Sequence, residues 1–123
     1  MKILLVDDAL MMRVLLRGIL ESGGYDVIAE AADGEEAVAL YRTHLPDVVT
    51  MDIVMPVQDG IETVRALRSF DPEARVIMVS AMGQESLIAE AMEAGALAYV
   101  LKPFNPEEVL AVMRMVEGAP IWT

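Results

Sequence analysis

Acidic, hydroxyl and amine side chains follow short apolar runs at several points of this sequence. Asp7 and Asp8 come directly after the first apolar run, and Asp52 follows another. Ser80 and Lys102 each follow a later apolar run. Carboxylates that converge raise one another's pKa unless a cation compensates their charge. Oxygen ligands without histidine or cysteine favour Mg²⁺, with Mn²⁺ as the alternative, over Zn²⁺.

This set of groups is suited to phosphoryl transfer, which requires an in-line nucleophile and neutralisation of the charge on the equatorial oxygens. One carboxylate can be the nucleophile and form an acyl phosphate. The Lys102 ammonium can neutralise a phosphate oxygen, and the Ser80 hydroxyl can donate a hydrogen bond to another. Taken alone, Ser80 is more simply a turn hydroxyl and Lys102 a solvated lysine. Only their joint position with the three acids favours the functional interpretation.

The elements that must position these groups alternate between β-rich and helical runs. Strands are predicted at Lys2–Val6, Tyr25–Glu30, Asp47–Met51, Arg75–Val79 and Ala98–Leu101. Helices are predicted at Leu10–Glu21, Glu35–Thr43, Ile61–Ser69, Glu85–Ala94 and Pro106–Glu117. Repeated strand–helix units predict an α/β fold with a parallel sheet covered on both faces. Ligands of such sheets bind beyond the carboxyl ends of the strands, where the reactive side chains are expected to lie.

The composition limits the class of protein. The 123 residues suit one domain, which we expect over residues 1–118, with 119–123 as a tail or the start of a linker. Hydrophobic residues make up 55% of the chain, but every apolar run is far shorter than the roughly 20 residues of a membrane span. The first apolar run ends at once in two acids, which argues against a signal peptide. We therefore expect a cytoplasmic protein without membrane insertion.

Charge and cysteine content exclude further classes. The formal net charge of −11 argues against direct binding of nucleic acid, because a polyanion would be repelled. The absence of cysteine excludes disulfides and thiolate metal sites.

In the order and spacing of its motifs, the sequence resembles the receiver domains of two-component response regulators over almost the whole chain. The matching segments are Val6–Asp8, Met51–Pro56, Asp59–Gly60, Ser80–Ala81, Tyr99 and Lys102–Phe104. The stand-alone chemotaxis regulators are the most similar subgroup, judging by Asp8-Ala9 before Met12-Arg13 and by Ser80–Gln84. The resemblance implies a flavodoxin-like (βα)5 doubly wound fold, with a five-stranded parallel sheet in the order 2-1-3-4-5 and helices on both faces.

The resemblance also implies a role for each matching residue. Asp52 would accept the phosphoryl group. Asp8 would bind Mg²⁺ directly, with Asp7 assisting largely through water, and Asp52 and the carbonyl of Val54 would complete the protein ligands. Lys102 would bind the phosphate.

Further residues would transmit or shape the response. Ser80 would turn toward the phosphate, and Tyr99 would then move inward. Pro56 and Gly60 would shape the loop after the acceptor, and the peptide bond before Pro103 would be cis, which helps to aim the lysine.

The implied function is that of a signalling switch, which catalyses only its own phosphorylation and dephosphorylation. A sensor histidine kinase or a phosphotransfer protein would supply the phosphoryl group. The face formed by Glu85–Ala94, Ala98–Leu101 and Pro106–Glu117 would then bind an output target, such as a flagellar switch protein. We expect a monomer. Val54 and Met82 are apolar where rapidly self-dephosphorylating relatives have polar side chains, so a separate phosphatase or back-transfer would end the signal.

Two other functions remain as alternatives. The chain could be the receiver domain of a larger response regulator with, for example, a DNA-binding or methylesterase output. A haloacid-dehalogenase-like Mg²⁺ phosphohydrolase is less consistent, because that chemistry needs two acids separated by one residue after the first strand. Here Asp7 and Asp8 are adjacent. A degenerate receiver that only docks is disfavoured by the intact acids and lysine.

The first predicted helix carries apolar residues on more than one stripe. One set can face the sheet: Met12, Leu16, Ile19 and Leu20. Met11, Leu15 and Gly18 form a second stripe beside the acidic site. This stripe is either a wide core face or a docking patch for the kinase, and the sequence does not decide between them.

Overall fold

The computed structural model describes residues 1–118, so the expected tail at 119–123 lies outside the described residues. Its strands are β1 (Lys2–Val6), β2 (Asp26–Ala31), β3 (Val48–Met51), β4 (Val76–Ser80) and β5 (Ala98–Leu101). Its helices are α1 (Leu10–Ser22), α2 (Gly34–His44), α3 (Gly60–Phe70), α4 (Glu85–Ala94) and α5 (Pro106–Glu117). Each predicted element is present, and no end is displaced by more than one residue.

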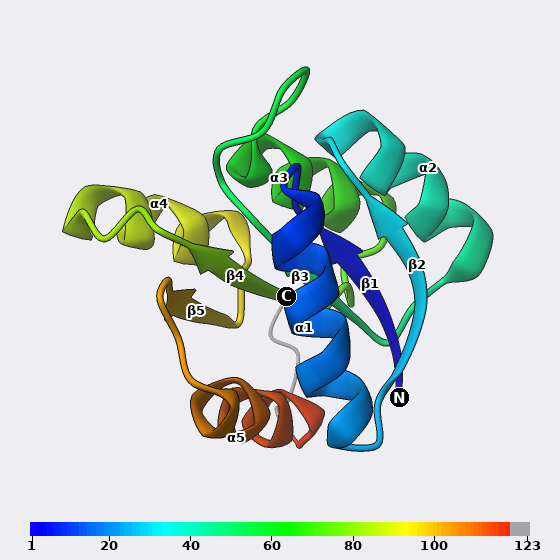
Figure 1. Ribbon diagram of the computed structural model, residues 1–123. Coiled ribbons are helices and arrows are strands. Elements are labelled where there is room, and N and C mark those ends of the chain that lie inside the picture. The colour runs from blue at the N-terminus through cyan, green and yellow to red at the C-terminus, as the bar shows by residue number, and fades with distance from the viewer. Residues whose placement is uncertain (119–123) are drawn as a thin grey trace.

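The strands form a single parallel sheet in the order β2-β1-β3-β4-β5, which confirms the expected topology. Helices α1 and α5 cover one face of the sheet, and α2, α3 and α4 cover the other (Figure 1). None of the helices within residues 1–118 is both long enough and apolar enough to span a bilayer.

Two apolar cores lie on the two faces of the sheet because successive strand residues point to opposite sides. Leu4 and Val49 belong to the core beneath α2, α3 and α4. Their neighbours Ile3, Leu5 and Val48 belong to the core beneath α1 and α5. Burial of the central strands on both faces explains why so much of the sequence is hydrophobic.

The ends of the helices are fixed by local hydrogen bonds. Asp33 accepts a hydrogen bond from the Glu36 amide at 2.8 Å and so caps the start of α2. Asp59 caps α3 in the same way through the Glu62 amide at 2.9 Å. Gly95 ends α4 with φ of 119°, a conformation that favours glycine. These caps fix where α2 and α3 begin and where α4 ends.

A buried hydroxyl in the central strand β3 lacks a partner. The Oγ1 atom of Thr50 makes no hydrogen bond within residues 1–118, although Thr50 is only 2% exposed. Thr63 in α3 is equally buried, but its hydroxyl donates to the Asp59 carbonyl at 2.7 Å. The two threonines therefore form a matched pair for testing what an unpaired hydroxyl contributes to stability.

We predict that Thr50→Val raises the free energy of unfolding by about 1 kcal/mol, because it removes an unpaired polar group at almost constant volume. Thr63→Val should lower it by about 1 kcal/mol, because a formed hydrogen bond is lost. Urea denaturation of both variants measures these changes. Equal destabilisation by the two substitutions would show that the Thr50 hydroxyl has a partner, such as a buried water.

Candidate functional site

Backbone hydrogen bonds bring the residues at the strand ends to one edge of the sheet. The amide of Asp52 donates to the Val6 carbonyl at 3.0 Å, which places Asp52 beside the residues that follow β1. The amide of Lys102 donates to the Ser80 carbonyl at 2.9 Å. The parallel ladder thus aligns side chains that lie far apart in the sequence.

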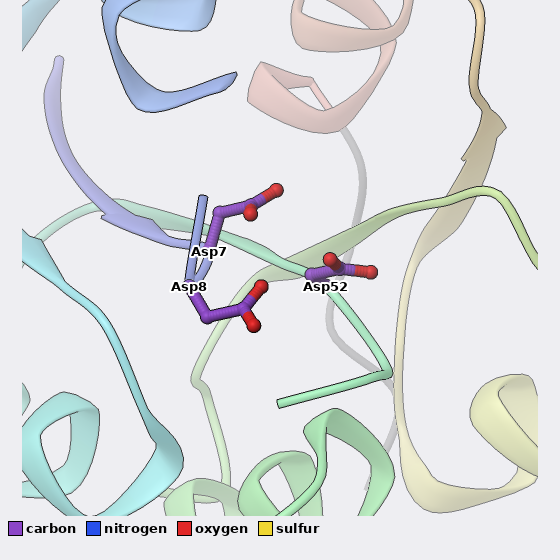
Figure 2. Close-up of side chains that lie close together, drawn as sticks. All are labelled: Asp7, Asp8 and Asp52. Atoms are coloured by element: carbon purple, nitrogen blue, oxygen red, sulfur yellow. The ribbon is translucent and has the colours of Figure 1, made fainter. Parts of the chain in front are cut away.

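Three carboxylates converge at this edge. One oxygen from each of Asp7, Asp8 and Asp52 lies within 4.8 Å of the others. The side chains come from the ends of β1 and β3 and gather in one place (Figure 2). Asp7 and Asp52 are buried, at 2% and 8% exposed, whereas Asp8 is exposed. The cluster is therefore open to solvent on the side of Asp8.

Lys102 bridges the two buried carboxylates. Its ammonium donates to Oδ2 of Asp7 at 2.8 Å and to Oδ2 of Asp52 at 3.1 Å. The remaining oxygens accept from backbone amides: Oδ1 of Asp7 from Ala9, and Oδ1 of Asp52 from Ile53, both at 2.8 Å. Each buried carboxylate is thus held in orientation by one amide and by the shared lysine.

The electrostatics of the site follow from this sharing. Burial raises the pKa of Asp52, and the charge of Asp7 raises that pKa further, while Lys102 opposes both effects. Burial alone would lower the pKa of Lys102, but the hydrogen bonds and charges of Asp7 and Asp52 outweigh it, so this pKa is raised. Lys102 therefore remains a cation. A single ammonium facing three carboxylates leaves the cluster with excess negative charge.

The donor set fits a hard divalent cation. All three side chains offer oxygen atoms, and the exposed Asp8 provides access from solvent. Val54 follows in the loop between β3 and α3, where its side chain is 59% exposed. Mg²⁺ suits such a site because it keeps several waters and binds through few carboxylates.

The loop after Asp52 packs closely against the backbone of Asp52 itself. A Cβ atom on Gly60 would lie 1.9 Å from the Asp52 carbonyl oxygen, so only glycine allows α3 to start here. Pro56 is exposed, and its carbonyl accepts from the Gln58 amide at 2.7 Å. Val57 between them has φ of 69°, which is unfavourable for a β-branched residue. At the other side of the site, the peptide bond before Pro103 is cis.

Ser80 and Tyr99 both contact Met82. The Ser80 hydroxyl is fully buried and accepts from the Met82 amide at 3.2 Å. The hydroxyl of the half-buried Tyr99 donates to the Met82 carbonyl. Burial is the main cause that raises the pKa of Tyr99. These two side chains therefore hold the start of the loop that leads from β4 to α4.

The second stripe of α1 is a surface feature. Leu16, Ile19 and Leu20 are buried against the sheet, whereas Met11 and Leu15 are 77% and 51% exposed. This exposure excludes the wide core face. Gly18 is exposed as well, and an added Cβ there would meet nothing within 4 Å.

Val14 extends this stripe, and our sequence reasoning did not identify it. Val14 is 56% exposed and lies three residues after Met11 and four before Gly18. The spacing of these residues on a helix could have revealed its place.

Comparisons with known proteins agree with this geometry. The family model described as "Response regulator receiver domain" matches residues 3–114. "Chemotaxis protein CheY" of Bacillus subtilis is 48% identical over 109 residues, which cover 89% of this chain and 91% of the relative. "Protein CcdB" of the same organism is 49% identical over 117 residues, covering 95% and 98%.

A solved structure is also very similar. It is described as the CheX-CheY-BeF3-Mg²⁺ complex from Borrelia burgdorferi, and the matching chain gives a TM-score of 0.93. That chain is 40% identical, and the match covers 96% of this chain and 90% of the other.

Proposed function

Because the chain belongs to the family of response regulator receiver domains and carries an acidic phospho-acceptor pocket, we propose a role in phosphoryl transfer for each residue of the site. Asp52 accepts a phosphoryl group from a sensor histidine kinase or a phosphotransfer protein. Asp7, Asp8, Asp52 and the carbonyl of Val54 hold Mg²⁺. The observation that supports this most is the sharing of Lys102 between Asp7 and Asp52. The chain is a signalling protein and not a conventional enzyme.

The groups at the site can carry out the transfer of a phosphoryl group to Asp52. An oxygen of Asp52 forms a bond to phosphorus while the bond between phosphorus and the donor nitrogen breaks. The Lys102 ammonium, 3.1 Å from Oδ2 of Asp52, can then move to a phosphoryl oxygen without leaving Asp7. Mg²⁺, when bound, neutralises charge on the phosphoryl oxygens. A relative solved with BeF3 and Mg²⁺ supports this assignment.

Signal output runs through Met82 in this proposal. A phosphoryl group on Asp52 offers an acceptor to the proton of the Ser80 hydroxyl. When the Ser80 side chain turns to donate to it, the hydroxyl oxygen moves away from the Met82 amide, from which it now accepts. Because Tyr99 holds the carbonyl of the same residue, the two side chains change together. Tyr99 lies in β5, so the change reaches the face formed by α4, β5 and α5.

The acceptor assignment is tested with acetyl phosphate and Mg²⁺. Wild type should acquire one stable phosphoryl group, and the Tyr99 ring signals should shift in NMR spectra. Asp52→Asn should abolish both, because an amide is not a nucleophile here. Asp8→Ala should weaken Mg²⁺ binding and labelling together. Wild-type labelling of Asp52→Asn at an aspartyl bond would refute the assignment, and repeated release of phosphate would indicate a phosphohydrolase.

We further propose a role in chemotaxis, as a cytoplasmic monomer that binds a flagellar switch protein. Similarity to chemotaxis regulators supports this role. The receiver domain of a larger response regulator is the alternative, and the equally similar "Protein CcdB" bears no chemotaxis name. Phosphorylation-dependent binding to the switch protein of the same organism separates the two. A dimer on phosphorylation, measured by sedimentation, would contradict the monomer.

Kinase docking is assigned to the exposed stripe of α1, which consists of Met11, Val14, Leu15 and Gly18. Met11→Lys should leave labelling by acetyl phosphate intact and slow transfer from the cognate kinase about tenfold or more, because it places a charge in an apolar contact. Met115→Lys is the matched control, since Met115 is 70% exposed but lies on α5. If both variants transfer equally fast, or if Met11→Lys loses labelling in both assays, this assignment is wrong.

The lifetime of the acyl phosphate depends on access of water opposite Asp52. Val54 and Met82 border this path in the family, and neither can orient a water with a strong hydrogen bond. We therefore expect a long-lived phosphoryl group, whose removal relies on a separate phosphatase or on back-transfer. A relative crystallised with CheX is consistent with a dedicated partner.

The combined substitution of Val54→Asn and Met82→Glu should speed loss of phosphate in excess Mg²⁺ by about tenfold, the effect of about 1.4 kcal/mol on the barrier. Loss of label from the purified phosphorylated protein measures this rate. An unchanged or slower rate would show that water orientation does not limit the lifetime.

A further inference from the structure

A charged group beside the acidic site has no part in the function proposed so far. Glu30, near the end of β2, lies between two arginines of α1. Its Oε1 accepts from Nε of Arg13 at 2.9 Å, and its Oε2 accepts from Nε of Arg17 at 2.8 Å. Burial alone would raise the pKa of Glu30, but the hydrogen bonds and charges of Arg17 and Arg13 outweigh it and lower this pKa. Glu30 is therefore a carboxylate that both arginines share.

The two arginines differ in what else they contact. The Arg13 side chain is only 16% exposed, and its Nη1 donates to the backbone carbonyl of Asp7 at 2.6 Å. The Arg17 side chain is 36% exposed and reaches the Val27 carbonyl and the Glu21 carboxylate instead, at 3.3 and 3.4 Å. Of the two arginines, Arg13 is the one that connects Glu30 to the acidic site.

The contact to Asp7 bears on the orientation of Asp8. The carbonyl of Asp7 belongs to the same planar peptide unit as the amide nitrogen of Asp8. A donor that fixes this carbonyl therefore fixes the plane from which the Asp8 side chain starts. The turn is held on its other side by Oδ1 of Asp7, which accepts from the Ala9 amide at 2.8 Å. Asp8 itself is exposed, so its direction depends on its backbone more than on packing.

We propose that Arg13 is a positioning residue for the cation site: held by Glu30, it orients the Asp7–Asp8 peptide so that the Asp8 carboxylate points into the acidic cluster. Glu30 has a second effect, because it occupies the guanidinium that could otherwise pair with an acidic side chain at the site. The inference rests on the Mg²⁺ site proposed above.

Charge and geometry predict opposite effects for the loss of Arg13. Removal of a positive charge near three carboxylates should by itself strengthen the binding of Mg²⁺. Loss of the hydrogen bond to the Asp7 carbonyl should weaken it, since groups that orient metal ligands typically change metal affinity by tenfold or more. The sign of the change therefore distinguishes positioning from charge.

Calorimetric titration of Mg²⁺ into wild type, Arg13→Gln and Arg17→Gln tests the proposal. Arg13→Gln should bind Mg²⁺ about tenfold more weakly. Arg17→Gln removes the same charge from Glu30 but leaves the Asp7 carbonyl contact in place, so it should bind like wild type or more tightly. Hydrogen exchange without Mg²⁺ is a second readout: the Ala9 amide should exchange faster in Arg13→Gln only, while amides of the central strands should not change.

Several results of these titrations and exchange measurements would overturn the positioning role of Arg13. Wild-type Mg²⁺ affinity or tighter binding in Arg13→Gln would overturn the positioning role, and so would equal weakening in Arg17→Gln. Faster exchange throughout Arg13→Gln would mean general destabilisation and would also overturn the role. If wild type itself does not bind Mg²⁺, then the proposed cation site fails, and the exchange of the Ala9 amide still reports whether Arg13 holds the turn.

Discussion

The site depends on one ammonium shared by two buried carboxylates. Asp7 and Asp52 would be unfavourable neighbours without Lys102, because each buried charge costs several kcal/mol unless it is paired. The sharing leaves the cluster incompletely neutralised, and this is what makes it receptive to a cation and a phosphoryl group. We propose that a phosphoryl group on Asp52 draws the ammonium away from the Asp52 carboxylate while the contact to Asp7 remains. In our proposal, phosphoryl transfer and switching thus arise from the same arrangement.

The fold supplies this arrangement through features that are distant in sequence. The parallel ladder aligns the ends of β1, β3, β4 and β5, and the two cores hold the sheet in place from both faces. Gly60 lets α3 begin close to the end of β3, where any side chain would collide with the Asp52 carbonyl. Ser80 and Tyr99 both contact Met82, and we propose that a local change at the site passes to β5 through these contacts.

Much of this was predictable because it depends on periodicity and topology. The strand–helix alternation placed Asp7, Asp8, Asp52 and Lys102 at one edge, and the structure brings them together there. What could not be predicted depends on how elements are rotated and packed. The pairing of Arg13 with Glu30 needs the rotation of α1 against β2, and nothing in the spacing of the two residues shows it. The unpaired hydroxyl of Thr50 and the positive φ of Val57 likewise arise from tertiary packing and loop closure.

We propose that Asp52 and Lys102 form a phosphoryl site in which the lysine changes partners. A crystal structure of the protein with beryllium fluoride and Mg²⁺ tests it most directly, because the fluoride complex imitates an acyl phosphate. We predict beryllium bound to an oxygen of Asp52, Mg²⁺ beside Asp8, and the ammonium of Lys102 moved from Asp52 to a fluoride while it stays near Asp7. Beryllium fluoride bound at another carboxylate, or a lysine that still pairs with Asp52, would contradict the account.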